Sequence, residues 1–166
     1  MNRDSTVTTK TYARLLAAIE SQHVPVIEAY AGQEYTYGAV HLKVLWPTVG
    51  GLAKAKTTNE RSVVVKVTYG NEDILLTGDA PDTVEKQLLQ QGSDVAAEVL
   101  KVGHHGSGHS TTLNLLQAVH PEIATISVGA KNTYGHPATR VLNDLEKLGL
   151  EVLRTDVLGD ILVECS

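Results

Sequence analysis

The spacing of apolar residues changes along the chain, from a helical period to alternation and then to strands and helices in turn. Residues 9–22 carry apolar side chains on one helical face, which predicts a helix. Residues 24–30 are typical of a strand, and residues 31–47 of a hairpin pair in which apolar and polar positions alternate. Residues 48–60 are mostly small, contain glycine and are basic, so we expect a loop there.

From residue 61 onward the pattern predicts one sheet with helices packed on it. Residues 61–79 are two β-rich runs around a Gly70-Asn71 turn, and Pro81 begins a helix over 81–92. The elements expected after it are a strand at 97–103, a helix at 110–119 with Ser110 as N-cap, a strand at 122–129, a helix at 137–149, and closing strands at 150–155 and 159–165. We therefore expect an α/β (α+β) fold in one domain, residues 1–166.

Composition limits the classes of function. The formal charge of −5 argues against a broad surface that coats duplex phosphates, although a metal centre supplies local positive charge of its own. No apolar run reaches the length of a membrane helix, and the first ten residues lack the features of a signal peptide. We therefore expect no membrane contact by this chain and, by default, a cytoplasmic location.

Metal-binding side chains follow three successive strands. Asp79 ends the first strand, His104 and His105 end the second, and His136 follows the third. Carboxyl ends of strands in such sheets converge at one edge, and a carboxylate with neutral imidazoles suits zinc, manganese or iron. Each residue alone has a plainer reading, as a turn, cap or surface residue. We assign that plainer reading to the isolated histidines His23, His41 and His120.

Four ordered motifs carry a family resemblance. The stretches NERSVVVKVTYGNEDILLTGDA, EVLKVGHHGSGHS, VGAKNTYGHP and LRTDVLGDI resemble the second half of the metallo-β-lactamase-like domain of the ComEC family of competence proteins. The resemblance is strong over residues 57–164 and extends more loosely to the N-terminal helix. It implies an αββα sandwich, two metal ions (zinc or manganese) and hydrolysis by a metal-bound hydroxide.

The resemblance also implies roles for individual residues. Asp79 bridges the two metals, His104 ligates one of them with His105 as neighbour or substitute, and His136 lines the site as a ligand or a substrate contact. The implied catalytic residues are Asp79, His104 and His105, the metal ligands Asp79, His104 and His136, and the substrate-binding residues Ser107, Lys131 and His136.

The chain departs from the family where most ligands should be. The family's HxHxDH loop is absent. The histidine of the third motif is not evident either, and Asn59 and Ser62 stand in that region, as such residues tend to in ComEC relatives. We therefore expect a partial sandwich that lacks the N-terminal segment, weak metal binding, and poor or no hydrolysis by this chain alone. An exposed inner sheet face, expected to include Val63, Val65, Leu75 and Val102, predicts a homodimer or a partner that supplies the missing half.

Three functional readings stay open. The first is the C-terminal part of a ComEC-like metal-dependent hydrolase that cleaves a phosphodiester, with single-stranded DNA as a candidate substrate. The second is a non-catalytic, self-associating half-domain with a degenerate metal site. The third is another hydrolase on the same scaffold, such as a choline-phosphate esterase or a lactonase. If the gene continues upstream, the first reading places the chain in a membrane-tethered, outward-facing DNA-uptake protein.

Overall fold

The structure is a computed structural model that describes residues 9–164. Its strands are β1 (Glu34–Tyr37), β2 (Val40–Trp46), β3 (Val64–Tyr69), β4 (Glu72–Leu76), β5 (Val99–Lys101), β6 (Ile123–Ile126) and β7 (Glu151–Arg154). Its α-helices are α1 (Lys10–Ser21), α2 (Val49–Lys54), α3 (Asp82–Gln90), α4 (Leu113–Val119), α5 (Thr139–Lys147) and α6 (Thr155–Leu158). Two 3-10 helices, η1 (Asn59–Arg61) and η2 (Gly103–Gly106), complete the described elements.

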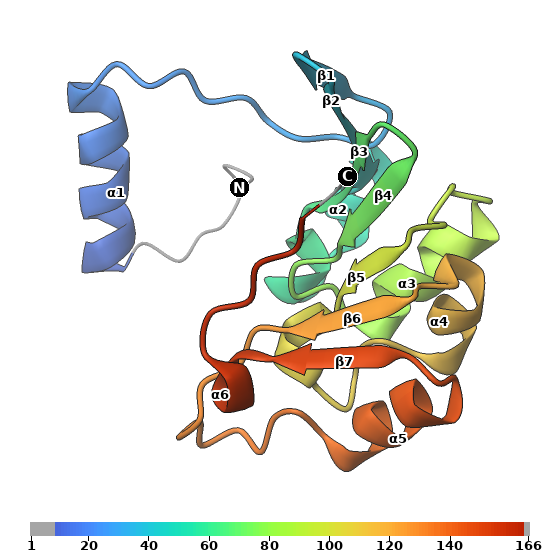
Figure 1. The fold of residues 1–166 in the computed structure, drawn as a ribbon. Coiled ribbons are helices and arrows are strands. Elements are labelled where there is room, and N and C mark those ends of the chain that lie inside the picture. The colour runs from blue at the N-terminus through green and yellow to red at the C-terminus, as the bar shows by residue number, and fades with distance from the viewer. Residues whose placement is uncertain (1–8, 165–166) are drawn as a thin grey trace.

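All seven strands form one sheet in chain order, from β1 at one edge to β7 at the other (Figure 1). Strands β1 to β4 pair antiparallel, and β4 to β7 pair parallel. Each parallel step moves the same way along the sheet through one helix. Because such crossovers are right-handed, α3, α4 and α5 all lie on the same face. The predicted mixed α/β class is therefore confirmed.

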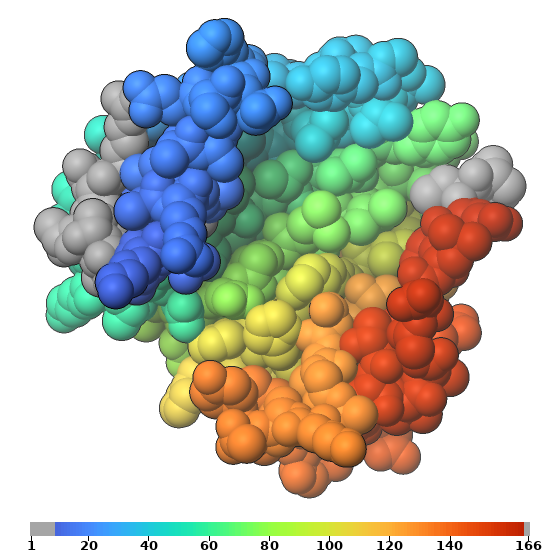
Figure 2. All heavy atoms as spheres, turned by 90° about the vertical axis from the view of Figure 1, so that its left-hand side faces the viewer, coloured from blue at the N-terminus to red at the C-terminus, as the bar shows by residue number. Residues whose placement is uncertain are grey.

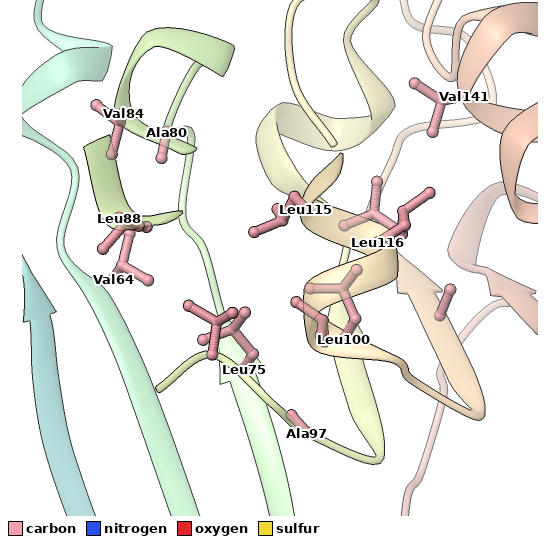
Figure 3. Packing of buried hydrophobic residues seen from close by; sticks show 14 of the residues in the cluster. Val64, Leu75, Ala80, Val84, Leu88, Ala97, Leu100, Leu115, Leu116 and Val141 are labelled. Atoms are coloured by element: carbon pink, nitrogen blue, oxygen red, sulfur yellow. The ribbon is translucent and has the colours of Figure 1, made fainter. Parts of the chain in front are cut away.

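The hydrophobic core lies between those three helices and the sheet (Figure 3). Leu75, Leu100 and Ala124 are fully buried on β4, β5 and β6. Helix residues pack against them, including Val84, Leu88, Leu115, Leu116, Val141 and Leu145. Two residues that we expected on an exposed face, Leu75 and Val102, belong to this core instead, because the pleat turns them toward the helices.

The opposite face of the sheet is largely apolar and carries no packed helix layer. Paired strand residues share a face, so the register defines one row across it, which is apolar from β2 to β6 and ends in a charge on β7: Tyr35, Leu42, Val67, Ile74, Val99, Ile123 and Glu151. A second row holds Val44, Val65, Leu76, Lys101, Thr125 and Leu153. Figure 2 looks onto this open face: strand atoms occupy its centre, with α1 at the upper left and the C-terminal segment at the right.

Two predictions before residue 61 were wrong. Residues 24–30 form no strand, and Val24, Val26 and Ile27 are 52%, 55% and 62% exposed. A stretch rich in apolar, β-branched residues becomes a strand only where another strand pairs with it. The predicted loop at 48–60 instead contains α2 and η1. Thr48 starts α2, because its hydroxyl accepts a hydrogen bond from the Gly51 N–H at 2.8 Å.

Two predictions after residue 109 were also wrong. The N-cap of α4 is Thr112, because the Ser110 hydroxyl is turned inward and donates to the Gly103 carbonyl at 2.8 Å. The second closing strand is absent over the part that the structure describes: α6 follows β7, and residues 159–164 are irregular. Cys165, at the end of that predicted strand, lies outside the described residues. Within residues 9–164 no helix combines the length and apolarity needed to cross a bilayer.

Candidate active site

The candidate site lies at the carboxyl ends of β4, β5 and β6. These strands are parallel neighbours, so the segments that leave them emerge on the same edge (Figure 1). Asp79 follows β4, His104 and His105 follow β5, and His136 lies in the segment between β6 and α5. A hydrogen bond from the His104 N–H to the Gly78 carbonyl, 3.0 Å long, joins the first two segments.

The two histidines after β5 sit in a strained turn. His104 and His105 both adopt left-handed backbone conformations, with φ of 49° and 56°. For residues other than glycine this conformation costs of the order of 1–2 kcal/mol each, so the surrounding contacts must hold it in place. The two imidazoles meet edge to face, with ring centroids 6.4 Å apart, and each has a different set of further neighbours.

His105 faces Asp79. Its Nδ1 donates to the Ser127 carbonyl at 2.6 Å, because a carbonyl can only accept. The other ring nitrogen, Nε2, lies 3.6 Å from Asp79 Oδ1, which is too long for a hydrogen bond. In a neutral ring, the Nε2 lone pair and the carboxylate therefore face the same small volume. That arrangement is stabilised by a proton or a metal cation between them.

His104 faces a different set of side chains. The Asn59 amide lies 3.3 Å from His104 Nε2, and the His136 ring centroid is 5.8 Å from that of His104. Ser62 supports the other side of the site, because its hydroxyl accepts from the Asp79 N–H at 3.2 Å. Asn59 and Ser62 thus both reach the site, Asn59 from η1 and Ser62 from the residue after it.

His136 lines an open pocket of about 450 Å³ that it shares with His105, Ser127, Asn132 and Tyr134. Burial lowers the pKa of His136 below 6.5, and the neighbouring His104 and His105 lower it further. Tyr134, 82% exposed, stacks on the His136 ring at 5.9 Å. Asn132 closes the segment, since its amide donates to the His136 carbonyl at 2.8 Å and accepts from the His136 N–H at 3.0 Å.

The predicted residues differ in how they meet the site. Asp79, His104, His105 and His136 gather at one edge. Lys131 is exposed in the same segment as His136. Ser107 is only 4% exposed, and its hydroxyl accepts from the His109 N–H at 3.3 Å, so it supports the turn from inside.

The donor set does not complete a metal site. Within residues 9–164, no three or more His, Cys, Asp or Glu side chains are placed so that they could hold a metal ion. A catalytic zinc needs about three protein ligands. The described residues therefore do not fit such an ion on their own, even though Asp79 and His105 face a common volume.

The sequence did not indicate two charged residues that support the backbone of the site from the helix layer. Glu85 in α3 and Arg140 in α5 both bind the backbone that follows the His104-His105 turn. The pattern held one signal for Glu85. It lies between Val84 and Leu88 on the buried side of its helix, where an acidic residue needs a specific partner. The sequence around Arg140 held no comparable signal, because its backbone partners lie about thirty positions earlier in the chain.

Comparison with known proteins yields relatives by sequence. The chain is 34% identical over 148 residues to ComE operon protein 3 of Bacillus subtilis, covering 89% of this chain and 19% of that protein. It is 35% identical over 130 residues to competence protein ComA of Neisseria gonorrhoeae, covering 78% and 18%. Recombination protein 2 of Haemophilus influenzae is 33% identical over 133 residues, covering 80% and 16%. The chain thus spans about a fifth of the length of these relatives. No family model matches it.

Solved structures add a likeness of fold. The CmlA β-hydroxylase E377D mutant aligns with a TM-score of 0.51 at 10% identity, over 79% of this chain and 32% of that chain. A structure from Thermotoga maritima, assigned to the Zn-dependent hydrolases of the metallo-β-lactamase superfamily, aligns with a TM-score of 0.45 at 11% identity, over 78% and 70%. At such low identity, the first likeness speaks for the mixed α/β fold alone.

Proposed function

Because this chain belongs to the ComEC family of competence proteins, within the segment that it shares with them, we propose that its site is part of a phosphodiesterase centre of metallo-β-lactamase type that acts on DNA. Single-stranded DNA is the proposed substrate, in the context of DNA uptake. The observation that carries the proposal is the pairing of His105 with Asp79. A carbonyl orients the imidazole, and its free nitrogen faces a carboxylate.

In this proposal each residue has a role that depends on its position at the carboxyl edge of the sheet. Asp79, His104 and His136 are the proposed metal donors, and His105, whose Nε2 faces Asp79, is a further donor beside it. Lys131 and His136 contact the substrate from the segment after β6, and Ser107 holds the turn beneath it. Zinc or manganese, when bound, would supply an activated water and a counter-charge for the phosphate.

The remaining donors come, in this proposal, from outside residues 9–164. The described side chains lack a three-ligand set, so the chain by itself should bind metal weakly and hydrolyse slowly or not at all. The face on which a complementary layer would sit is the open apolar face of the sheet, next to the site.

The test is metal binding and hydrolysis by the purified chain, compared with Asp79→Ala. Calorimetric titration with zinc and with manganese should show weak binding, and any cleavage of a bis-aryl phosphate or single-stranded oligonucleotide should require the metal. Asp79→Ala should remove both signals, whereas Glu146→Ala, at an exposed position near the C-terminal end of α5 and away from the site, should leave them unchanged. Absence of metal binding in the unmodified chain, up to millimolar metal, would overturn the proposal.

A second candidate function is a non-catalytic module that associates with itself. Its specific support is the open face, where Leu42, Val67, Ile74 and Ile123 form an apolar row with no helix layer over it. Apolar sheet faces pack against one another about 10 Å apart, and two copies related by a twofold axis present identical faces. A dimer that binds no metal and cleaves nothing would favour this candidate over the first.

A further inference from the structure

Glu85 is an acidic residue buried without a cationic partner among the described residues. Its exposure is 1%, and it lies on the core side of α3 beside Val84 and Leu88. A carboxylate in such a place is costly unless hydrogen bonds satisfy it. Its oxygens accept from the N–H of Thr111, and from the N–H and hydroxyl of Thr112 at 2.9 and 2.8 Å. All of its recorded partners thus belong to one short segment.

That segment carries strain and is connected to the site. Thr111 has a φ of 53°, a left-handed conformation that is especially unfavourable for a β-branched residue. The Thr111 hydroxyl accepts from the Gly103 N–H at 3.0 Å, and the Ser110 hydroxyl donates to the Gly103 carbonyl at 2.8 Å. Gly103 directly precedes His104. A continuous chain of hydrogen bonds therefore runs from Glu85, through Thr111, to the start of the His104-His105 turn.

Arg140 binds the carbonyl side of the same segment. From α5 its guanidinium donates to the carbonyls of Gly108 at 3.3 Å, of Thr111 at 3.2 Å and of Ser110. Asp144, one turn further along the helix, accepts from Arg140 at 3.0 Å and keeps the guanidinium in this orientation. Glu85 thus binds N–H groups and Arg140 binds carbonyl groups of one segment, from helices on either side of it.

We propose that Glu85 and Arg140 are positioning residues, which clamp residues 108–112 and thereby hold His104 and His105 in the left-handed turn that aims His105 at Asp79. The inference rests on the proposed function only in treating that turn as part of a hydrolytic site. Without the clamp, the turn loses its support at Gly103 and relaxes toward ordinary backbone angles. His105 then loses the Ser127 carbonyl that orients its ring.

The experiment is NMR spectroscopy of the whole chain in Glu85→Gln and Arg140→Lys. Glutamine keeps the size of the side chain but offers one acceptor oxygen instead of two, and lysine keeps the charge but not the planar fork. In both variants we expect loss of the φ-sensitive backbone couplings of the left-handed state at His104 and His105. We also expect loss of the imidazole nitrogen shifts that mark the Nδ1-protonated form of His105. Amide signals of β2 and β3, far from the clamp, should stay in place.

The control is Glu146→Gln, an exposed acid on α5, which should leave all of these signals unchanged. Folded variants that keep the couplings and the imidazole shifts of the unmodified chain would overturn the inference. If Glu85→Gln fails to fold, Arg140→Lys decides by the same criteria. The readout requires neither metal nor turnover. Loss of the turn in the variants of a chain that binds no metal, up to millimolar concentration, would therefore support the clamp and count against the proposed function.

Discussion

Nε2 of His105 and Oδ1 of Asp79 face each other across 3.6 Å, each at the end of its own parallel strand. Neither atom carries a hydrogen while Nδ1 of His105 donates to Ser127 and the ring is neutral. The pair therefore presents two lone-pair donors to a cation, although the described residues do not complete a coordination shell around that position.

The first prediction follows from this pair. His105→Ala should lower whatever affinity the chain has for zinc or manganese by about 10- to 100-fold, because it removes an oriented nitrogen beside Asp79. His120→Ala is the matched control, because His120 follows α4 away from the site. The metal affinity of this variant should equal that of the unmodified chain. Calorimetric titration of all three proteins at one pH provides the measurement. Equal affinities for His105→Ala and His120→Ala would contradict the role of the pair.

The second prediction concerns Lys101, which lies at the end of β5 on the open face. Burial lowers the pKa of Lys101 below 10.5, and the negative charge of Asp79 acts in the opposite direction. Between the folded and the unfolded pKa the unfolded chain binds more protons, so stability rises with pH through that window. At pH values below the pKa of Lys101 in the folded chain, the buried ammonium is charged and lowers the free energy of unfolding by its full amount. Lys101→Met should therefore raise the denaturation midpoint at neutral pH.

The advantage of Lys101→Met should shrink as the pH approaches 10.5, where the unmodified chain no longer carries the buried charge. Urea titrations at several pH values measure it, with Lys86→Met, an exposed lysine on α3, as the control with no such trend. A Lys101→Met chain that is less stable than the parent at neutral pH would show that the ammonium makes a net favourable contact.

The local sequence pattern predicted correctly those strands that find a paired neighbour and those helices that have one apolar face. The hairpin of β3 and β4, the helices α3 and α5, and the strand ends that carry Asp79 and His104 follow from periodicity and turn residues near in sequence. Residues 24–30 show the limit, because this apolar, β-branched stretch has no strand to pair with. The contacts of Glu85 and Arg140 span 26 to 32 residues, and no local pattern encodes which backbone groups they meet.

In the site, too, local sequence predicted some features and distant contacts decided the others. Parallel strand order brings Asp79, His104, His105 and His136 to one edge of the sheet, as their positions after successive strands predicted. The separate directions of His104 and His105 could not be predicted, because they depend on two left-handed residues in succession, a conformation that histidine seldom adopts. Nor could the burial of Ser107, since it results from the inward fold of that same turn.

The third prediction concerns the ion pairs of Lys66, whose side chain is 8% exposed on β3. Its ammonium lies 2.8 Å from Asp73 and 3.0 Å from Asp94. Burial lowers the pKa of Lys66, but the hydrogen bonds to Asp73 and Asp94 outweigh it and raise the pKa above 10.5. Lys66→Ala should cost about 1–3 kcal/mol, between an exposed and a buried pair, because Asp94 is largely exposed.

The pH dependence of that cost has a definite sign. The hydrogen bond from Lys66 lowers the pKa of Asp94 below 3.8, so its share of the stability is present above 3.8 and is lost as the pH falls through the folded value. The share of Lys66 is present below 10.5 and is lost as the pH rises beyond it. Urea midpoints should therefore differ most between these limits. Lys147→Ala, which removes an exposed ion pair with Asp144 on α5, far from Lys66, is the control and should cost about 0–1 kcal/mol. A constant difference down to pH 2 would point to lost packing of the lysine stem instead.

The fourth prediction concerns the open face of the sheet. Its apolar row and the 38% exposure of Leu76 beside it leave a surface that soluble monomers seldom present. We expect two copies to pack these faces together, with the charges of Glu72, Lys101 and Glu151 on the same face around the apolar row. Sedimentation velocity should show a dimer, and Val67→Lys, which places an ammonium in the middle of the row, should shift it to the monomer. Gln90→Lys, on the exposed side of α3, adds the same charge elsewhere and should leave the dimer intact.

Circular dichroism checks that both variants are folded. A parent chain that sediments as a monomer at every concentration would exclude self-association, and a layer supplied by another part of a longer protein would then be the remaining way to cover the face.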